Sequence, residues 1–149
     1  MRGNVVMHIR EVSYMFEEFE SGITDNSSDD YWYDEGLFYY QDVLDSFSDE
    51  DWKALSEKIG DYSEKAQIRC VECLSESDNR NNLLMILKIS ETKNRELFVT
   101  CVDSLRNMDI SSLSQSEKER LLQRVNEYSA DASSPEKAVL KAFIDAVGY

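Results

Sequence analysis

The sequence has few residues that interrupt helices and few that support catalysis. It contains one proline and five glycines in 149 residues, and the alternating apolar and polar pattern of a half-buried strand is scarce. The glycines are scattered, which excludes a glycine-rich loop that cradles phosphate. The single histidine, His8, borders an apolar helix stripe, and no convincing Ser-His-Asp or Cys-His system can be built around it. We therefore expect a helical protein that is not an enzyme.

Long apolar runs are absent as well. No stretch approaches the roughly 18 apolar residues of a membrane span, and the first residues lack a secretory apolar stretch. Hydrophobic residues make up 42% and charged residues 31%, which is typical of a folded soluble chain. The odd number of cysteines, three, indicates reduced core thiols and no disulfide framework. These features predict one cytoplasmic domain, residues 1–149, without a cofactor.

Positive charge is scarce in the first third of the chain. Residues 1–51 hold fourteen acids and two bases, for a net charge of −12, whereas residues 52–149 carry −2. Phosphates and anionic membrane surfaces would be repelled by such a chain. Nine of the sixteen aromatic residues of the chain lie within Tyr14–Tyr40, inside this acidic third. Acids interleaved with aromatics favour a basic protein as the partner, because acids steer association and aromatics supply rigid contact area.

Helical spacing of apolar residues dominates the rest of the sequence and predicts an all-α fold of about eight helices. The start of the first helix is ambiguous, since Val5–Ile9 alone also fits a strand. Ser48 with Asp51, and Ser114 with Glu117, resemble capping boxes. We predict a polar loop at Ser21–Asp30. The predicted helices are Asn4–Glu20, Asp34–Phe47, Ser48–Gly60, Ser63–Leu74, Asp78–Ile89, Thr92–Leu105, a seventh capped by Ser114, and an eighth from Ser134 to Gly148.

A five-residue pattern (apolar, apolar, acid, small, apolar) recurs along the chain. Its copies are Val43–Phe47, Cys70–Leu74, Cys101–Leu105 and Phe143–Val147, with another apolar helix between successive copies. This rhythm predicts stacked antiparallel helix pairs whose second helices form an inner layer, with an irregular helical bundle as the alternative. On these segments the chain resembles the HEAT-like helical-repeat families. Small acidic domains of this kind resemble bacterial toxin-immunity proteins, as in contact-dependent growth inhibition.

The candidate partner-binding surface lies on the first two predicted helices and the loop between them. Acids and tyrosines fall there at helical spacing, opposite the apolar stripes. An ordinary solvated face, with Trp32 packed onto the core, is the alternative, but exposed aromatics at this density favour an interface. The predicted contact residues are Glu11, Tyr14, Glu18, Asp29, Asp30, Tyr31, Trp32, Tyr33, Asp34, Glu35, Tyr39 and Asp42.

Two other patterns resemble metal or redox sites in part. Cys70 and Cys73 form a CxxC inside a predicted helix, where core packing is favoured over a redox or zinc site. The acid-rich stretch after Asp25 matches a calcium loop only in part, because it lacks the central glycine. We therefore predict no metal site.

The function that these features favour is binding and neutralisation of a basic cognate toxin by an immunity protein, with a nuclease as one candidate toxin. Two alternatives stay open at this point: an acidic helical scaffold or adaptor in a cytoplasmic assembly, and a helical enzyme or ligand-binding domain with a pocket between repeats.

Overall fold

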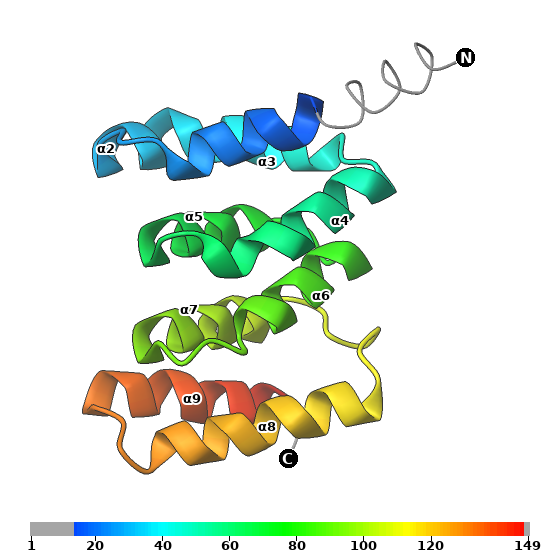
Figure 1. The fold of residues 1–149 in the computed structure, drawn as a ribbon. Coiled ribbons are helices and arrows are strands. Elements are labelled where there is room, and N and C mark those ends of the chain that lie inside the picture. Colours follow the sequence, from blue (N-terminus) through cyan, green and yellow to red (C-terminus); the bar gives the residue numbers. More distant parts are fainter. Residues whose placement is uncertain (1–13, 148–149) are drawn as a thin grey trace. The chain divides into compact units, whose positions relative to one another are not determined.

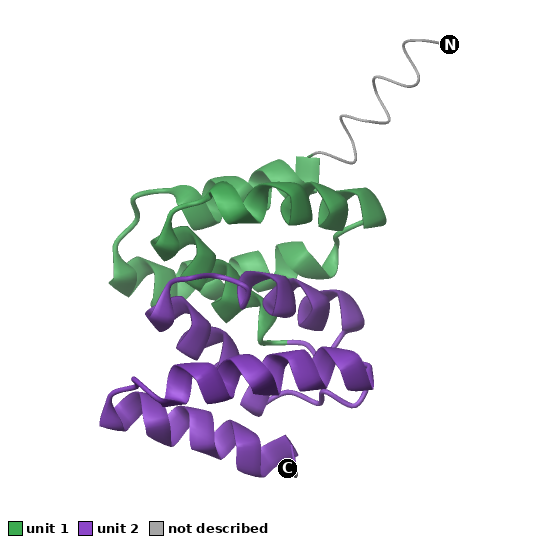
Figure 2. Cartoon of the chain, turned by 60° about the horizontal axis from the view of Figure 1, so that its bottom comes forward, with its two compact units in different colours: residues 1–76 green, residues 77–149 purple. Residues whose placement is uncertain are grey.

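The computed structural model describes residues 14–147, and these residues form helices joined by short connections, with no strand among them (Figure 1). The predicted all-α fold is therefore confirmed. No helix within this range is both long enough and apolar enough to cross a membrane. The chain divides into two compact units, residues 1–76 and residues 77–149 (Figure 2).

Unit 1, residues 1–76, begins in the described range with a helical segment, residues 14–24. An almost continuous helical stretch follows after a short loop, and its middle is a π-helix. The further elements are α2 (Asp29–Tyr31), the π-helix η1 (Trp32–Gly36), α3 (Leu37–Asp45), α4 (Asp49–Lys58), the 3-10 turn η2 (Ile59–Asp61) and α5 (Glu64–Leu74).

The predicted loop at Ser21–Asp30 is only partly correct. The first helical segment continues to residue 24, and the second helix begins at Asp29 and not at Asp34. Gly22 lies inside the first segment. The ring of Tyr40 packs directly on it and leaves no room for a Cβ at this position. The earlier start of α2 has a cap: the side chain of Ser28 accepts a hydrogen bond from the Tyr31 backbone N–H. The predicted start of the first helix, at Asn4, and the possible strand at Val5–Ile9 lie outside the described residues.

Aromatic contacts hold the first helical segment, α3 and α4 together. Phe19 is fully buried and meets the rings of Tyr40 and Phe47 edge-on, at centroid distances of 6.5 and 5.5 Å. Phe47 in turn packs edge-on against Trp52, with centroids 5.1 Å apart. Edge-to-face pairs at these distances are favoured by the quadrupoles of the rings. The predicted capping box at the start of α4 is confirmed, because Ser48 and Asp51 each bond the backbone of the other.

Unit 2, residues 77–149, contains four helices in its described part, up to residue 147. Asparagine caps begin the first two of them, at Asn79 and Asn94, which moves their starts slightly later than predicted. The capping box of Ser114 with Glu117 is present as predicted. The helices are α6 (Arg80–Ile89), α7 (Arg95–Arg106), α8 (Gln115–Ser129) and α9 (Ser134–Val147).

The recurring five-residue pattern falls mainly on α3, α5, α7 and α9. Within unit 1, α3 packs against α5, and within unit 2, α7 packs against α9. In each unit, therefore, the two helices that carry the pattern are neighbours, as an inner layer of second helices requires. A solenoid that runs through both units stays a prediction.

The three cysteines are buried on the apolar sides of α5 and α7, and none of them is in a disulfide. Burial raises the pKa of the Cys73 thiol well above its ordinary value and that of Cys101 to about 12. Both groups are therefore neutral at physiological pH and poor nucleophiles.

Candidate functional site: an acidic aromatic surface

The negative charge of the chain is concentrated in unit 1. Residues 1–76 contain nineteen acids and six bases, a net charge of −13, whereas residues 77–149 contain eleven acids and ten bases. The charge asymmetry of the sequence therefore coincides with the division into units. The negative electrostatic potential is therefore expected to be stronger around unit 1 than around unit 2.

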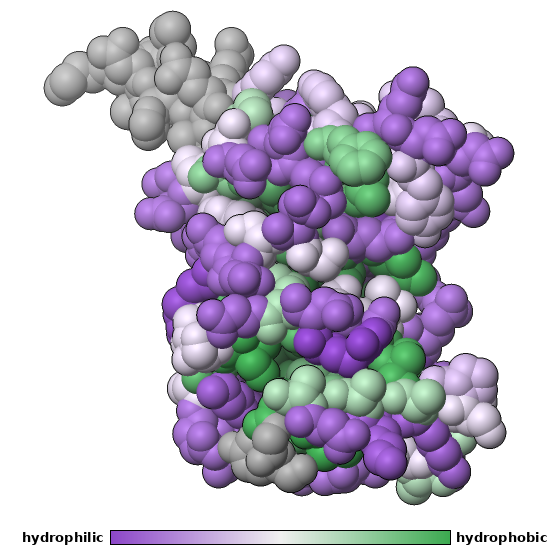
Figure 3. Space-filling view, turned by 180° about the vertical axis from the view of Figure 1, so that it is seen from behind, coloured by the Kyte–Doolittle hydropathy of each residue, from purple (hydrophilic) through white to green (hydrophobic). Residues whose placement is uncertain are grey.

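Exposed aromatic side chains are concentrated in the same unit. Among the described residues, the large hydrophobic side chains that are exposed all belong to unit 1, with exposed fractions between 49% and 63%. The exposed side chains are Tyr14, Tyr31, Tyr33, Phe38 and Tyr39. Figure 3 shows one face of the molecule coloured by hydropathy, with hydrophobic side chains among hydrophilic ones in both units.

Exposed or partly exposed acids alternate with these aromatics along the chain, and we call the two sets together the acidic aromatic surface. Nine of the predicted contact residues are exposed on it, and Glu18 is partly exposed. Glu11 lies outside the described residues. The surface comprises Tyr14, Glu18, Asp29, Asp30, Tyr31, Tyr33, Asp34, Glu35, Phe38, Tyr39 and Asp42.

The prediction of Trp32 as an exposed contact residue is wrong. Its side chain is 1% exposed, and its ring stacks on Tyr40 with centroids 6.0 Å apart. The indole Nε1 donates a hydrogen bond to Glu72 Oε1 at 3.2 Å, which satisfies the polar atom that burial would otherwise leave without a partner. Trp32 is therefore a core residue of unit 1, and the residues on either side of it in the chain, Tyr31 and Tyr33, are exposed.

A buried arginine fixes the loop before α2. The Arg69 side chain is 2% exposed, and its guanidinium lies 4.8 Å from the Trp32 ring. It donates hydrogen bonds to the Ser27 carbonyl at 2.9 Å and to Asp25 at 3.4 Å, and it lies 3.8 Å from the Asp29 carboxylate. Because a buried guanidinium must be paired, these contacts hold residues 25–29 against α5. Hydrogen bonds from Ser27, helped by Arg69, lower the pKa of Asp25.

A second contact joins the first helical segment to α3 across the surface. The Tyr39 hydroxyl donates a hydrogen bond to Glu18 Oε1 at 2.5 Å. This bond and the nearby Glu18 charge raise the pKa of Tyr39 to about 12. The bond orients a carboxylate beside an exposed ring.

Tyr33 is also held by a carboxylate, that of Glu72 on α5. Hydrogen bonding to Glu72, followed by desolvation, raises the pKa of Tyr33 to about 12. The Glu72 carboxylate thus accepts hydrogen bonds from both Trp32, which is buried, and Tyr33, which is half exposed. The orientation of the exposed ring is coupled to the core through a single carboxylate on α5.

The first helical segment also shows how an acid and an aromatic of this protein hold a cation. Lys58 Nζ lies 5.4 Å from the centre of the Phe16 ring and 3.3 Å from Glu20 Oε2. Phe16 and Glu20 are four residues apart and share one face of the helix. Tyr14 and Glu18 repeat this spacing on the acidic aromatic surface. Among the described residues, no lysine or arginine forms an ion pair with Glu18.

Sequence reasoning missed three residues that matter for this surface. Phe38 is 62% exposed on α3, and its position four residues from both Asp34 and Asp42 was a usable signal. Arg69 and Glu72 were missed because their roles depend on tertiary contacts with residues about forty positions away in the chain. The π-helix Trp32–Gly36 was missed as well, and such local irregularities often occur at functional sites.

The comparisons with known proteins add no relative: no family model, no curated protein and no solved structure matches this chain.

Proposed function

We propose that the protein is an immunity protein, an inhibitor that binds and neutralises a basic cognate toxin through the acidic aromatic surface of unit 1. The observation that carries the proposal is the coincidence of exposed aromatics with the net charge of −13 in one unit. Exposed aromatic clusters are costly in solution, and acids around them suit a cationic partner.

The chemistry of the surface supports lysine and arginine side chains as the groups that it binds. The contact of Lys58 with Phe16 and Glu20 is a cation–π interaction combined with an ion pair. Tyr14 and Glu18 offer the same pair of groups, and Tyr39 holds the Glu18 carboxylate in place. A partner side chain there would make the intermolecular counterpart of the Lys58 contact.

A toxin that acts on nucleic acid is the partner class we favour. Such a protein needs lysine and arginine to bind phosphates. A rigid surface that carries carboxylates competes for those side chains. Inhibition then follows from occlusion of the toxin's substrate-binding face, and electrostatic steering makes the association fast.

Affinity capture from the native host, followed by co-expression, tests the proposal. The wild-type chain is expected to retain a basic protein that is toxic when it is expressed alone and is tolerated when the chain is present. An Asp34→Lys, Asp42→Lys variant is expected to lose both capture and protection. The matched control is Glu96→Lys, Asp145→Lys, which reverses the same number of exposed acids in unit 2. Capture of a protein without toxicity, or equal capture by the Asp34→Lys, Asp42→Lys variant, would contradict the proposal.

A further inference from the structure

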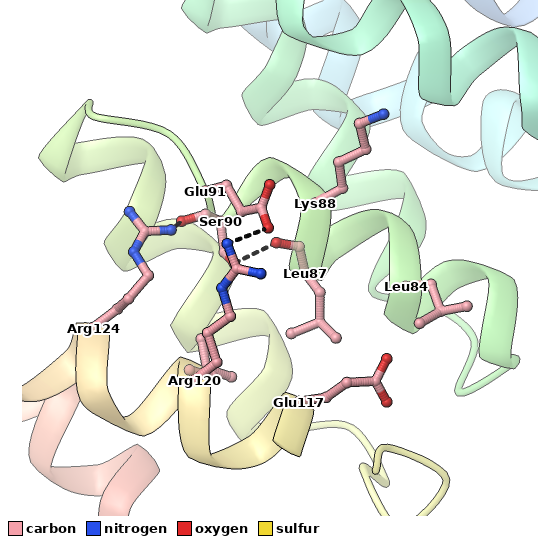
Figure 4. A pocket seen from close by; sticks show the side chains of 9 residues that line it. Leu84, Leu87, Lys88, Ser90, Glu91, Glu117, Arg120 and Arg124 are labelled. Atoms are coloured by element: carbon pink, nitrogen blue, oxygen red, sulfur yellow. Dashed lines mark hydrogen bonds and ion pairs between the residues drawn. The ribbon is translucent and has the colours of Figure 1, made fainter. Parts of the chain in front are cut away.

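A cavity lies between α6 and α8, within unit 2 (Figure 4). Its volume is about 410 Å³, which falls in the range of small-molecule sites. The lining residues follow helical spacing on both helices, so two helix faces form its walls. They are Leu84, Leu87, Lys88, Ser90 and Glu91 from α6 and its C-terminal end, and Glu117, Arg120, Leu121 and Arg124 from α8.

The cavity has an apolar wall and a cationic end. Leucines from both helices, Leu84, Leu87 and Leu121, supply the apolar wall. Arg120 and Arg124 lie beside the C-terminal end of α6, where they contact Glu91 and the Ser90 carbonyl, and Lys88 in the last turn of that helix also lines the cavity. Three cations against two acids give the lining a net charge of +1 in a chain whose net charge is −14. This lining therefore differs in sign from the chain as a whole.

Arg124 is held in place by the protein itself. Its guanidinium donates hydrogen bonds to the Ser90 carbonyl and, at 2.7 Å, to the Thr92 carbonyl, and it lies 4.9 Å from the Phe98 ring. A guanidinium fixed in this way supplies positive potential without the cost of ordering a flexible side chain.

Arg120 is the exchangeable cation of the cavity. It pairs with Glu91 at 3.1 Å, and the two side chains are 71% and 53% exposed. An ion pair this exposed contributes little to stability, so a ligand carboxylate can replace Glu91 as the partner of Arg120. Glu117, the other acid, is engaged elsewhere, because it accepts a hydrogen bond from the Ser114 backbone N–H at 2.7 Å.

We propose that the cavity between α6 and α8 binds a small amphipathic carboxylate, with the carboxylate on Arg120 and the apolar chain along Leu84, Leu87 and Leu121. Apolar walls that bury a ligand's body and a few polar groups that fix its orientation are the usual design of small-molecule sites. This proposal is independent of partner binding by unit 1.

Titration of the full chain with octanoate tests the proposal. Isothermal calorimetry is expected to show saturable binding of octanoate below about 5 mM. Neither 1-octanol, which lacks the carboxylate, nor propionate, which lacks the chain, is expected to saturate the protein in that range. In methyl-labelled protein, octanoate is expected to shift the resonances of Leu84, Leu87 and Leu121.

Variants separate a specific site from general anion or detergent-like binding. Arg120→Gln is expected to weaken octanoate binding at least about tenfold. Leu87→Asp, which places a carboxylate in the cavity, is expected to abolish it. The matched control is Arg106→Gln, because Arg106 pairs with Asp103 on α7 and does not line the cavity. Circular dichroism establishes that each variant is folded.

Three outcomes would overturn the proposal. One is the absence of saturable octanoate binding to the wild-type chain. Another is unchanged affinity in folded Arg120→Gln. The third is methyl shifts that fall in unit 1 and leave Leu84, Leu87 and Leu121 unmoved.

Discussion

Replacement of Trp32 distinguishes a core residue from an interface residue most clearly. The side chain is 1% exposed, stacks on Tyr40 and bonds Glu72 through its indole N–H. Truncation of a buried tryptophan to alanine costs about 3–5 kcal/mol, through lost burial and the cavity that remains. Trp32→Phe keeps an aromatic ring but removes the N–H. A hydrogen bond to a charged group contributes about 1.5–3 kcal/mol, so this variant is expected to lose a smaller amount.

Urea unfolding monitored by far-ultraviolet circular dichroism measures both effects. Total stability of a domain is only about 5–15 kcal/mol, so the loss in Trp32→Ala is a large fraction of it. The matched control is Tyr31→Ala, which removes the preceding aromatic, whose side chain is 49% exposed. A surface substitution of this kind is expected to change the free energy of unfolding by no more than about 0.5 kcal/mol.

One result would contradict a core position for Trp32. If Trp32→Ala unfolds at the same urea concentration as the wild type while partner binding is lost, the indole is an exposed anchor and not a core side chain. The network of Trp32, Arg69 and Glu72 would then have no part in the stability of unit 1.

Three further predictions follow from the structure. Gly22→Ala is expected to lower stability by about 1–3 kcal/mol, because the new Cβ would lie 2.1 Å from Tyr40 Cζ. Gly60→Ala is the control, because nothing lies within 4 Å of a Cβ there. Equal melting temperatures of the two variants would contradict the expectation. The pKa of Tyr33 rises from 10.0 to about 12 on folding, so its contribution to stability is complete below about pH 10 and is lost as the pH rises through 12. Unfolding free energies of wild type and Tyr33→Phe across this range check the sign, and a pH-independent difference would be evidence against the Glu72 bond. The three buried thiols are expected to react with a disulfide reagent only after unfolding, and rapid labelling of the native chain would show that they are accessible.

Much of the fold could be predicted because its signals are local. The serine caps at Ser48 and Ser114 place two helix starts correctly, since a capping box depends on residues three positions apart. The recurring five-residue pattern identified the helices that pack against each other within each unit. The start of the second helix was placed too late because the cap at Ser28 and the π-helix after it were not recognised.

The candidate site was predictable in composition but not in detail. Spacing along a helix put Tyr39 and Asp42 on an exposed face, and the structure agrees. Spacing could not decide whether Trp32 faces solvent, because its burial depends on Arg69 and Glu72 from a helix far along the chain. The long-range pairing of a buried cation with loop carboxylates carries no local sequence signal.

We propose that the acidic aromatic surface binds a basic partner, and the most direct test is the rate of association with the basic protein captured from the host. Stopped-flow measurements at several salt concentrations compare the wild type with Asp34→Lys, Asp42→Lys, with Phe38→Ala, and with the unit 2 control Glu96→Lys, Asp145→Lys. We expect slower association and a weaker salt dependence for the unit 1 charge reversal, faster dissociation for Phe38→Ala, and wild-type behaviour for the control. Unchanged rates in both unit 1 variants would show that the acidic aromatic surface is a solvated face and that the partner binds elsewhere.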